Sequence, residues 1–455
     1  MTSKNAFIAC HRFGLGPHPG EMSQAAGDPQ GWLRAQLSGP LPRLRTGEKR
    51  LSAADKLANL HLAPKEERGD IRRGYFDEIK LLVDDHFHQR QISKRPYAER
   101  LAAFWGNHFA VGNNSRAISS VITDHYADAI RPYMFGSFKD LLVAALTHPV
   151  MIGYLDNHLS FGPNSPLGEL RKVRMNENLA RETLELHTLG VNGGYTQDDV
   201  VALAKVYTGW SFTSPKTLGD EARYAEKIGG FGERRIGGGV FFSAYHERGP
   251  KTVLGKTYEE EGHQELLKVL EDLAAHPATA RHIATKLVRH FVADDPPGGA
   301  VKRIETVFLR TGGNLPSVYE ALIDLPHAWQ QPFAKAKTMV DFVTAADRAL
   351  IDYLPEPTGR SGILHNLGQA PLRPPSPEGF SDREEAWLTA AGVQRRLAYI
   401  ALLSRKLRPP LLSVRVFEDT IGPVVSKRTD RAVFGAASAK DAVGLILASP
   451  EFQRR

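Results

Sequence analysis

Residues 174–210 read RMNENLARETLELHTLGVNGGYTQDDVVALAKVYTGW, and this stretch predicts a helix, a glycine turn and a second helix. Gly190 ends the first helix, and the pair Gly193–Gly194 allows the positive φ that a sharp reversal requires. Thr196, with Asp199 three residues later, is typical of a capping box at the start of the second helix. The fold is therefore expected to be organised around a helical hairpin.

The first helix of this hairpin carries more polar groups than an ordinary amphipathic core helix. At roughly 100° per residue, one stripe about 100° wide holds four polar residues, whereas His187 points almost the opposite way. The stripe consists of Asn178, Arg181, Glu182 and Glu185. Leucines flank it on both sides, so we expect the helix to be buried among other helices. Buried carboxylates require partners.

Several segments resemble the signature of the bacterial domain of unknown function 1800 family. The matching segments are residues 176–182, 185–191, 193–197 and 208–210, together with Arg12–Pro17, Phe104–Phe109, Tyr154–Asn157, His276–Arg281 and Leu367–Gln369. The resemblance is nearly full length and implies a mainly helical fold, but it brings no established reaction. Members are often encoded beside a domain of unknown function 1501 protein, which resembles the alkaline phosphatase and sulfatase group. The resemblance therefore suggests a partner rather than an activity.

Length and patterning predict one mainly α, multi-helical body. A chain of 455 residues would ordinarily contain two or three domains, but no clear linker divides it, so residues 1–455 are expected to form a single domain. Glycines and short apolar runs predict a small β-hairpin insertion at 216–258. Pro355–Asp382 is the nearest approach to a linker, and Leu367–Gln369 and Trp387 are expected to pack it against the body.

Composition excludes several classes of protein. Although the formal charge is +7, no basic run is interleaved with exposed aromatics, so nucleic-acid binding is not expected. The single cysteine, Cys10, excludes intramolecular disulfides and cysteine-based metal clusters. No apolar run is long enough for an integral membrane segment, and no signal peptide is visible. The chain as written is expected to be soluble and cytoplasmic; a removed signal, or co-export with a partner, would place it in the periplasm.

Familiar catalytic and cofactor motifs are missing from the sequence. Neither the Rossmann nor the P-loop glycine spacing occurs, so no nucleotide cofactor is expected. Gly-x-Ser-x-Gly and His-Glu-x-x-His are also absent, which leaves standard serine hydrolases and zincins without support.

The strongest candidate site combines Glu182 and Glu185 with an imidazole from another helix, His108. Carboxylates and imidazole projected inward from several helices are typical of metal sites, here for iron, manganese or zinc, and also serve acid–base catalysis. As metal ligands, His108 and a glutamate would lie within roughly 3–5 Å of each other. The residues expected to bind substrate are Asn157, Asn178, Arg181, His246 and Lys251.

Each of these assignments has a structural alternative. Arg181 pairing with Glu185 would make the stripe a buried structural network, and His187 fits a hydrogen-bonded core histidine. His246 and Lys251 could contact an anionic substrate or merely hold a turn; the family pattern shows His-Asp where this chain has His-Glu. A basic face on the helix near 277–292 is expected to be solvated. It consists of Arg281, His282, Lys286, Arg289 and His290.

Two hypotheses about function follow. The first is a metal-dependent enzyme with its site on the central helix. The second is a non-catalytic partner or chaperone of the phosphatase-like or sulfatase-like protein encoded beside it.

Overall fold

The computed structural model describes residues 3–44, 50–113, 115–236, 238–259, 262–355 and 360–455. Helices make up most of this described chain and strands only a small part, which confirms the mainly α prediction. Many helices begin at a Ser, Thr, Asp or Asn whose side chain accepts a backbone N–H three residues later, as at Ser137 and Thr338.

The first part of the chain contains ten α-helices within the described residues: α1 (Lys4–Ile8), α2 (Glu21–Ala25), α3 (Pro29–Arg34), α4 (Ala53–Leu62), α5 (Arg68–Ile92), α6 (Pro96–His108), α7 (Arg116–Ser119), α8 (Ile122–Asp124), α9 (Phe138–Leu146) and α10 (Pro149–Tyr154). The middle part contains α11 (Asn178–Glu182), α12 (Gln197–Tyr207), α13 (Pro215–Ile228), α14 (His263–Ala275), α15 (Pro277–Phe291), α16 (Gly298–Arg310) and α17 (Leu315–Ile323). The last part contains α18 (Met339–Ala349), α19 (Arg360–Asn366), α20 (Ala390–Lys406), α21 (Ser413–Thr420), α22 (Lys427–Phe434), α23 (Ala439–Ala448) and α24 (Pro450–Gln453).

Short 3₁₀ and π turns extend several of these helices. The π turns are η1 (Ala9–Phe13), η3 (His125–Ile130) and η5 (Thr183–His187). The 3₁₀ turns are η2 (Ala35–Leu37), η4 (Asn157–Leu159), η6 (Ser243–Tyr245), η7 (Pro326–Trp329), η8 (Ile351–Tyr353), η9 (Glu384–Ala386) and η10 (Gly422–Val424).

The central hairpin forms from α11, η5 and α12. Its capping box at Thr196 and Asp199 is present as predicted. Gly190 and Gly194 adopt positive φ values of 85° and 86°. Gly193 does not; a Cβ there would lie 2.3 Å from that of Leu189, so close approach rather than φ requires this glycine. Helix α11 also begins only at residue 178, and its continuation is a π turn rather than a straight α-helix.

The insertion is more complex than a single β-hairpin. Strands β1 (Trp210–Ser211), β3 (Gly239–Phe242) and β2 (Glu233–Ile236) form an antiparallel sheet in that order. Strands β4 (Lys251–Val253) and β5 (Lys256–Tyr258) form a separate hairpin. Helix α13 occupies most of the first half of the predicted insertion.

One continuous hydrophobic cluster runs from Ala6 to Phe452, and a small second cluster lies under the insertion around Phe161 and Tyr245. The segment after α19 packs against the body as predicted, since Leu367 and Trp387 are each only 7% exposed. The number of domains stays a prediction.

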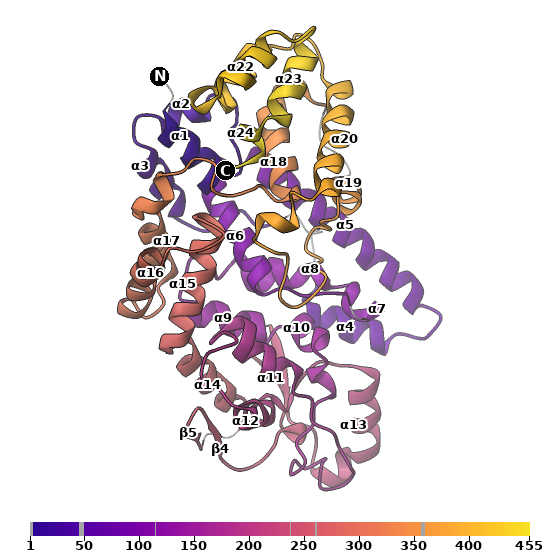
Figure 1. The fold of residues 1–455 in the computed structure, drawn as a ribbon. Coiled ribbons are helices and arrows are strands. Elements are labelled where there is room, and N and C mark those ends of the chain that lie inside the picture. Colours follow the sequence, from indigo (N-terminus) through magenta and orange to yellow (C-terminus); the bar gives the residue numbers. More distant parts are fainter. Residues whose placement is uncertain (1–2, 45–49, 114, 237, 260–261, 356–359) are drawn as a thin grey trace.

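Sequence-distant parts meet in the upper half of the molecule. The N-terminal helices α1 and α2 lie near the C-terminal helices α22 and α24, while the central hairpin and β4–β5 lie in the lower half (Figure 1). Arg12 donates a hydrogen bond to the carbonyl of Arg455 (3.4 Å), and Lys335 exchanges backbone hydrogen bonds with Arg455. Helix α6 lies between the two halves (Figure 1).

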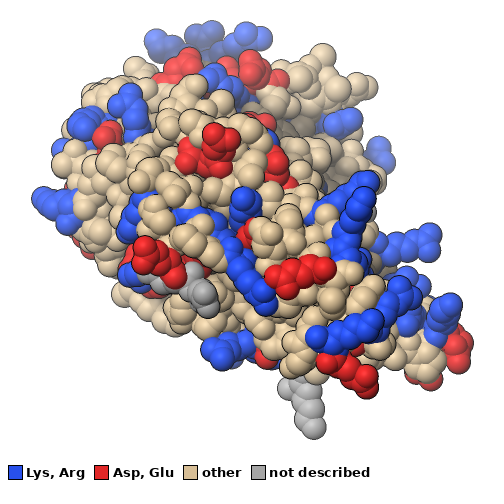
Figure 2. Space-filling model, turned by 90° about the horizontal axis from the view of Figure 1, so that it is seen from below, with Lys and Arg blue, Asp and Glu red and all other residues tan. Residues whose placement is uncertain are grey.

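Charges on the lower face are mixed. Figure 2 shows Lys and Arg side chains singly or in small groups, with Asp and Glu side chains between them. Among the described residues, no helix has both the length and the apolar character needed to cross a membrane.

Candidate functional site

The two glutamates of the central helix are half-buried rather than enclosed. Burial, and then the charge of Glu185, raise the pKa of Glu182. Tyr195 donates a hydrogen bond to Glu185 (3.3 Å), and burial followed by the negative charge of Glu182 raises the pKa of Tyr154. The carboxylates therefore lie in a tyrosine-containing environment that favours a protonated Glu182.

The rest of the polar stripe faces solvent. Asn178 is exposed, which corrects the expectation that this helix is buried among other helices. Arg181 pairs with Glu177 (3.2 Å) and also donates to Gln197 (2.9 Å). Arg181 therefore pairs with Glu177 rather than with Glu185 as in the structural alternative, because the glutamate one turn earlier offers the more favourable i,i+4 order.

His108 and His187 face each other. Nε2 of His108 lies 3.3 Å from the carbonyl of His187, and Nδ1 of His187 lies 3.1 Å from the carbonyl of His108. Both side chains are buried, and burial followed by the positive charge of Lys286 lowers the pKa of His187 to about 3. His187 is thus a hydrogen-bonded core histidine as predicted, but its neighbour is His108 itself.

The predicted metal ligands are not assembled. No group of three or more His, Cys, Asp or Glu side chains in the described parts of the chain could hold a metal ion, and these parts include His108, Glu182 and Glu185. The Asn157 amide is used by the backbone, since it donates to the carbonyls of Tyr207 (3.1 Å) and Trp210 (2.9 Å). The geometric reason is that His108 is directed to the backbone of η5, whereas the glutamates are half-exposed.

His246 and Lys251 do meet, at a buried carboxylate that the sequence did not indicate. Lys251 Nζ lies 2.9 Å from Glu265 Oε2 and also donates to the carbonyl of Glu247 (2.6 Å). His246 Nε2 lies 3.1 Å from the same Glu265 oxygen, and its Nδ1 bonds the carbonyl of Thr208 (2.7 Å). These contacts fix the turn, and His246 and Lys251 also line a cleft of about 620 Å³.

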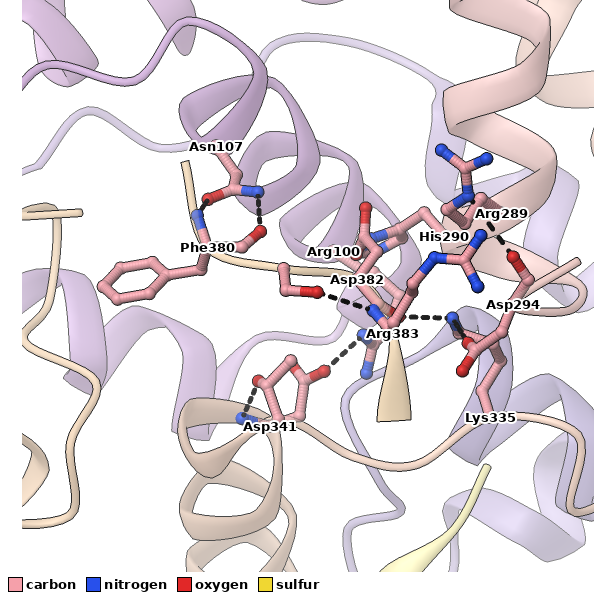
Figure 3. A network of polar contacts seen from close by, with 12 residues as sticks. Arg100, Asn107, Arg289, His290, Asp294, Lys335, Asp341, Phe380, Asp382 and Arg383 are labelled. Atoms are coloured by element: carbon pink, nitrogen blue, oxygen red, sulfur yellow. Dashed lines mark hydrogen bonds and ion pairs between the residues drawn. The ribbon is translucent and has the colours of Figure 1, made fainter. Parts of the chain in front are cut away.

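A separate cavity of about 100 Å³ lies where α5, α6, α15, α18 and the segment after α19 meet. Its charged or hydrogen-bonding lining residues include His86, Arg90, Asn107, Tyr126, His290, Thr338, Asp341, Gln369 and Asp382. Figure 3 shows how α6, α15, α18 and residues 380–383 bring such side chains together. Clefts and cavities with a few convergent polar groups are the usual form of small-molecule sites.

The segment after α19 is held firmly beside this cavity. The side-chain amide of Asn107 donates to the carbonyl of Phe380 (2.8 Å) and accepts its N–H (2.7 Å) (Figure 3). Gln369 Oε1 accepts the N–H of Val340 (2.8 Å) at the start of α18. Gly379 has a φ of 88°, and a Cβ there would lie 2.5 Å from the carbonyl oxygen of Asn107. Glycine at this position therefore lets the loop approach α6.

His290 and Asp382 form a directed pair on the cavity wall. Nδ1 of His290 lies 2.6 Å from Asp382 Oδ1, and Nε2 has no hydrogen-bond partner among the described residues. Burial alone would raise the pKa of Asp382, but the neighbouring His290 and Lys335 hold it at about 2. Burial lowers the pKa of His290, and Asp382 opposes this. At neutral pH the pair is thus a carboxylate accepting from Nδ1–H, with the lone pair on Nε2.

Sequence reasoning missed both members of this pair. His290 is 8% exposed, not part of a solvated face as expected, because α15 lies between α6 and the segment containing Asp382. Asp382 ends the stretch Pro355–Asp382, which is the nearest approach to a linker in the sequence. The two residues are separated by 92 positions, so no local spacing connects them.

Fold and cavity together define a mainly helical protein with a buried histidine–aspartate pair beside a small cavity. A family model described as "Protein of unknown function (DUF1800)" matches residues 8–454, and the chain belongs to this family. No curated protein and no solved structure matches the chain.

Proposed function

We propose that this protein is an enzyme that performs general-base catalysis in the cavity, with His290 as the base and Asp382 as the residue that orients it. The observation that carries the proposal is the free Nε2 of a buried histidine whose Nδ1 is fixed by a carboxylate. This arrangement fixes the tautomer and leaves the other nitrogen to accept a proton.

The pair acts on a proton of the substrate or of a bound water rather than on a protein nucleophile. Three hydroxyl side chains line the cavity, and each already has another role. The phenol oxygen of Tyr126 accepts a hydrogen bond from Arg131 (3.5 Å). Thr338 caps α18 by accepting the N–H of Asp341 (3.2 Å), and Ser381 accepts the N–H of Arg383 (3.1 Å). In the reaction, Nε2 takes the proton and Asp382 stabilises the positive imidazolium. If the proton comes from a C–H bond, the electron pair of that bond stays on carbon as a carbanion. If it comes from water, the oxygen forms a bond to the substrate carbonyl carbon, the bond to the leaving group breaks, and the imidazolium returns the proton to the leaving group.

The test requires two measurements, the tautomer of His290 and the rate of turnover. Long-range ¹⁵N–¹H NMR at pH 7 should show His290 protonated on Nδ1, and Asp382→Asn should change that tautomer. A screen of small esters, amides and hydroxy acids should find a turnover that His290→Gln lowers by about 10²–10⁴-fold. The control is His365→Gln, at an exposed position on α19. Turnover that survives in His290→Gln would overturn the proposal.

The metal hypothesis and the partner hypothesis are separate proposals with their own tests. Elemental analysis of the purified protein tests for iron, manganese or zinc held by Glu182 and Glu185. Co-purification with the domain of unknown function 1501 protein encoded beside it tests for a partner. If that complex forms and no turnover depends on His290, the buried pair has a structural role only.

A further inference from the structure

Positive charge exceeds negative charge beside the cavity. Asp341 faces three guanidinium groups: Arg100 at 3.0 Å, Arg90 at 3.4 Å and Arg455 at 3.8 Å. Each of these arginines is only 1% exposed. Burial alone would raise the pKa of Asp341, but the three arginines hold it far below its usual range. One carboxylate is thus in contact with three positively charged guanidinium groups.

Neighbouring acids do not remove this excess. Asp382 supplies a second negative charge, whereas Asp294 is paired with Lys335. Lys337 is fully buried and donates to the carbonyls of Phe452 and Arg454, not to a carboxylate. Three arginines against Asp341 and Asp382 leave at least one positive charge without a partner, before Lys337 is considered. Unpaired buried charge is costly, so such a group is normally matched by an anion.

Arg90 is the cation that borders the cavity. A guanidinium has five N–H donors, yet the side chain of Arg90 makes one hydrogen bond in the described structure, the 3.4 Å contact with Asp341. Its Nε has no partner among the described residues, and the same is true of Nδ1 of His86, which also lines the cavity. A buried donor left unsatisfied destabilises the fold, so an acceptor in the cavity would be stabilising.

We infer that the substrate of the proposed enzyme is a small carboxylate, bound with its carboxylate on Arg90 and its reacting proton toward Nε2 of His290. This inference rests on the proposed function and names its substrate class. A monoanion matches the one positive charge by which the three arginines exceed Asp341 and Asp382, and a planar guanidinium binds carboxylate in a bidentate manner. The cavity of about 100 Å³ is smaller than the cavity of roughly 150 Å³ that accommodates benzene, so the part of the substrate that enters it has only a few heavy atoms.

Binding can be measured without knowing the reaction. Isothermal titration calorimetry at fixed ionic strength would compare acetate and glycolate with acetamide, their neutral relative, and with inorganic phosphate. Acetate or glycolate should bind and acetamide should not. Arg90→Gln should weaken acetate binding at least tenfold. Arg90→Lys should weaken it less, because a lysine keeps the positive charge but lacks the paired N–H donors of a guanidinium. Equal binding of acetate and acetamide, binding of phosphate in place of the carboxylates, or unchanged binding in Arg90→Gln would each overturn the inference.

Two further variants separate the possible failures. Ala103 lines the cavity from α6, so Ala103→Leu should fill it and abolish acetate binding even if Arg90→Gln does not fold. Ala202→Leu, at a half-buried position on α12, is the matched control and should bind acetate normally. His290→Gln removes the base but keeps the anchor, so its acetate affinity should change less than threefold. If His290→Gln binds acetate and its turnover equals that of the wild type, the proposed general base is wrong. If turnover requires His290 but the wild type binds no carboxylate, the inferred substrate class is wrong.

Discussion

Replacing His187 by phenylalanine should make the stability of the protein less dependent on pH. His187 is fully buried, and its pKa is lowered to about 3 from an ordinary value of 6.5. Because the folded pKa lies below the unfolded one, the unfolded chain takes up a proton at this position as the pH falls below 6.5 and the folded chain does not. Stability is therefore lost on acidification, by about 2 kcal/mol between pH 7 and pH 5 for this residue alone.

The assay is urea unfolding followed by circular dichroism at pH 7 and pH 5 and constant ionic strength. His187→Phe also removes the hydrogen bond to the carbonyl of His108, but this cost is the same at both pH values and cancels in the comparison. The wild type should lose about 2 kcal/mol more than the variant between the two pH values. His365→Phe, at an exposed position, is the control and should behave like the wild type. Equal losses in wild type and His187→Phe would refute the reasoning.

Three further changes test the described contacts. Glu265→Gln leaves Lys251 buried without its carboxylate and should lower the free energy of unfolding by about 3–5 kcal/mol, measured by urea titration. Arg181→Ala breaks a pair with Glu177 whose side chains are 41% and 35% exposed, so it should cost less than about 1 kcal/mol in the same assay. The pKa of Glu182 is raised in the folded protein, so the free energy of unfolding decreases as the pH rises and this carboxyl ionises. Glu182→Gln removes that loss, and relative to the wild type it should therefore be more stabilising at pH 8 than at pH 5. A metal equivalent that this last variant abolishes would instead support the metal hypothesis.

The hairpin could be predicted because its signals are local. Thr196 and Asp199 form the capping box within one turn, and Gly190 takes the left-handed conformation that ends a helix. The π turn at Thr183–His187 has no comparable signal, since it reflects how the turn packs against neighbouring elements. The π turn keeps the opposite directions expected of a straight helix, since His187 contacts α6 while Glu185 stays half-exposed.

Helix α13 was obscured by the glycines that follow it. Ser214 caps it, Pro215 is its first residue and Gly229 ends it in a left-handed conformation, all of which are ordinary start and stop signals. The Gly-rich strands after residue 229 dominated the composition of the whole segment and led to a single hairpin prediction. Composition is averaged over neighbouring elements and so does not locate their boundaries, whereas capping residues mark the two ends of each helix.

Buried charges were the least predictable feature. Arg90, Arg100 and Arg455 would each be placed on the surface by residue type, and His290 was placed there by the basic face of its helix. Their burial depends on contacts between helices far apart in the chain, such as Arg100 with Asp341, separated by 241 positions. The periodicity of a single helix gives no information about a partner so far away in the sequence.

The segments that carry the family resemblance nevertheless point to the cavity, though not to its chemistry. Asn107 and Gln369 belong to two of these segments, and both use side-chain amides to fix the loop and α18 at the cavity wall. His290 and Asp382 lie outside them. Positioning groups must satisfy fixed backbone donors and acceptors, whereas a reacting group must match its substrate. We therefore expect the shared segments to specify where the cavity lies, and residues such as His290 and Asp382 to determine which reaction takes place in it.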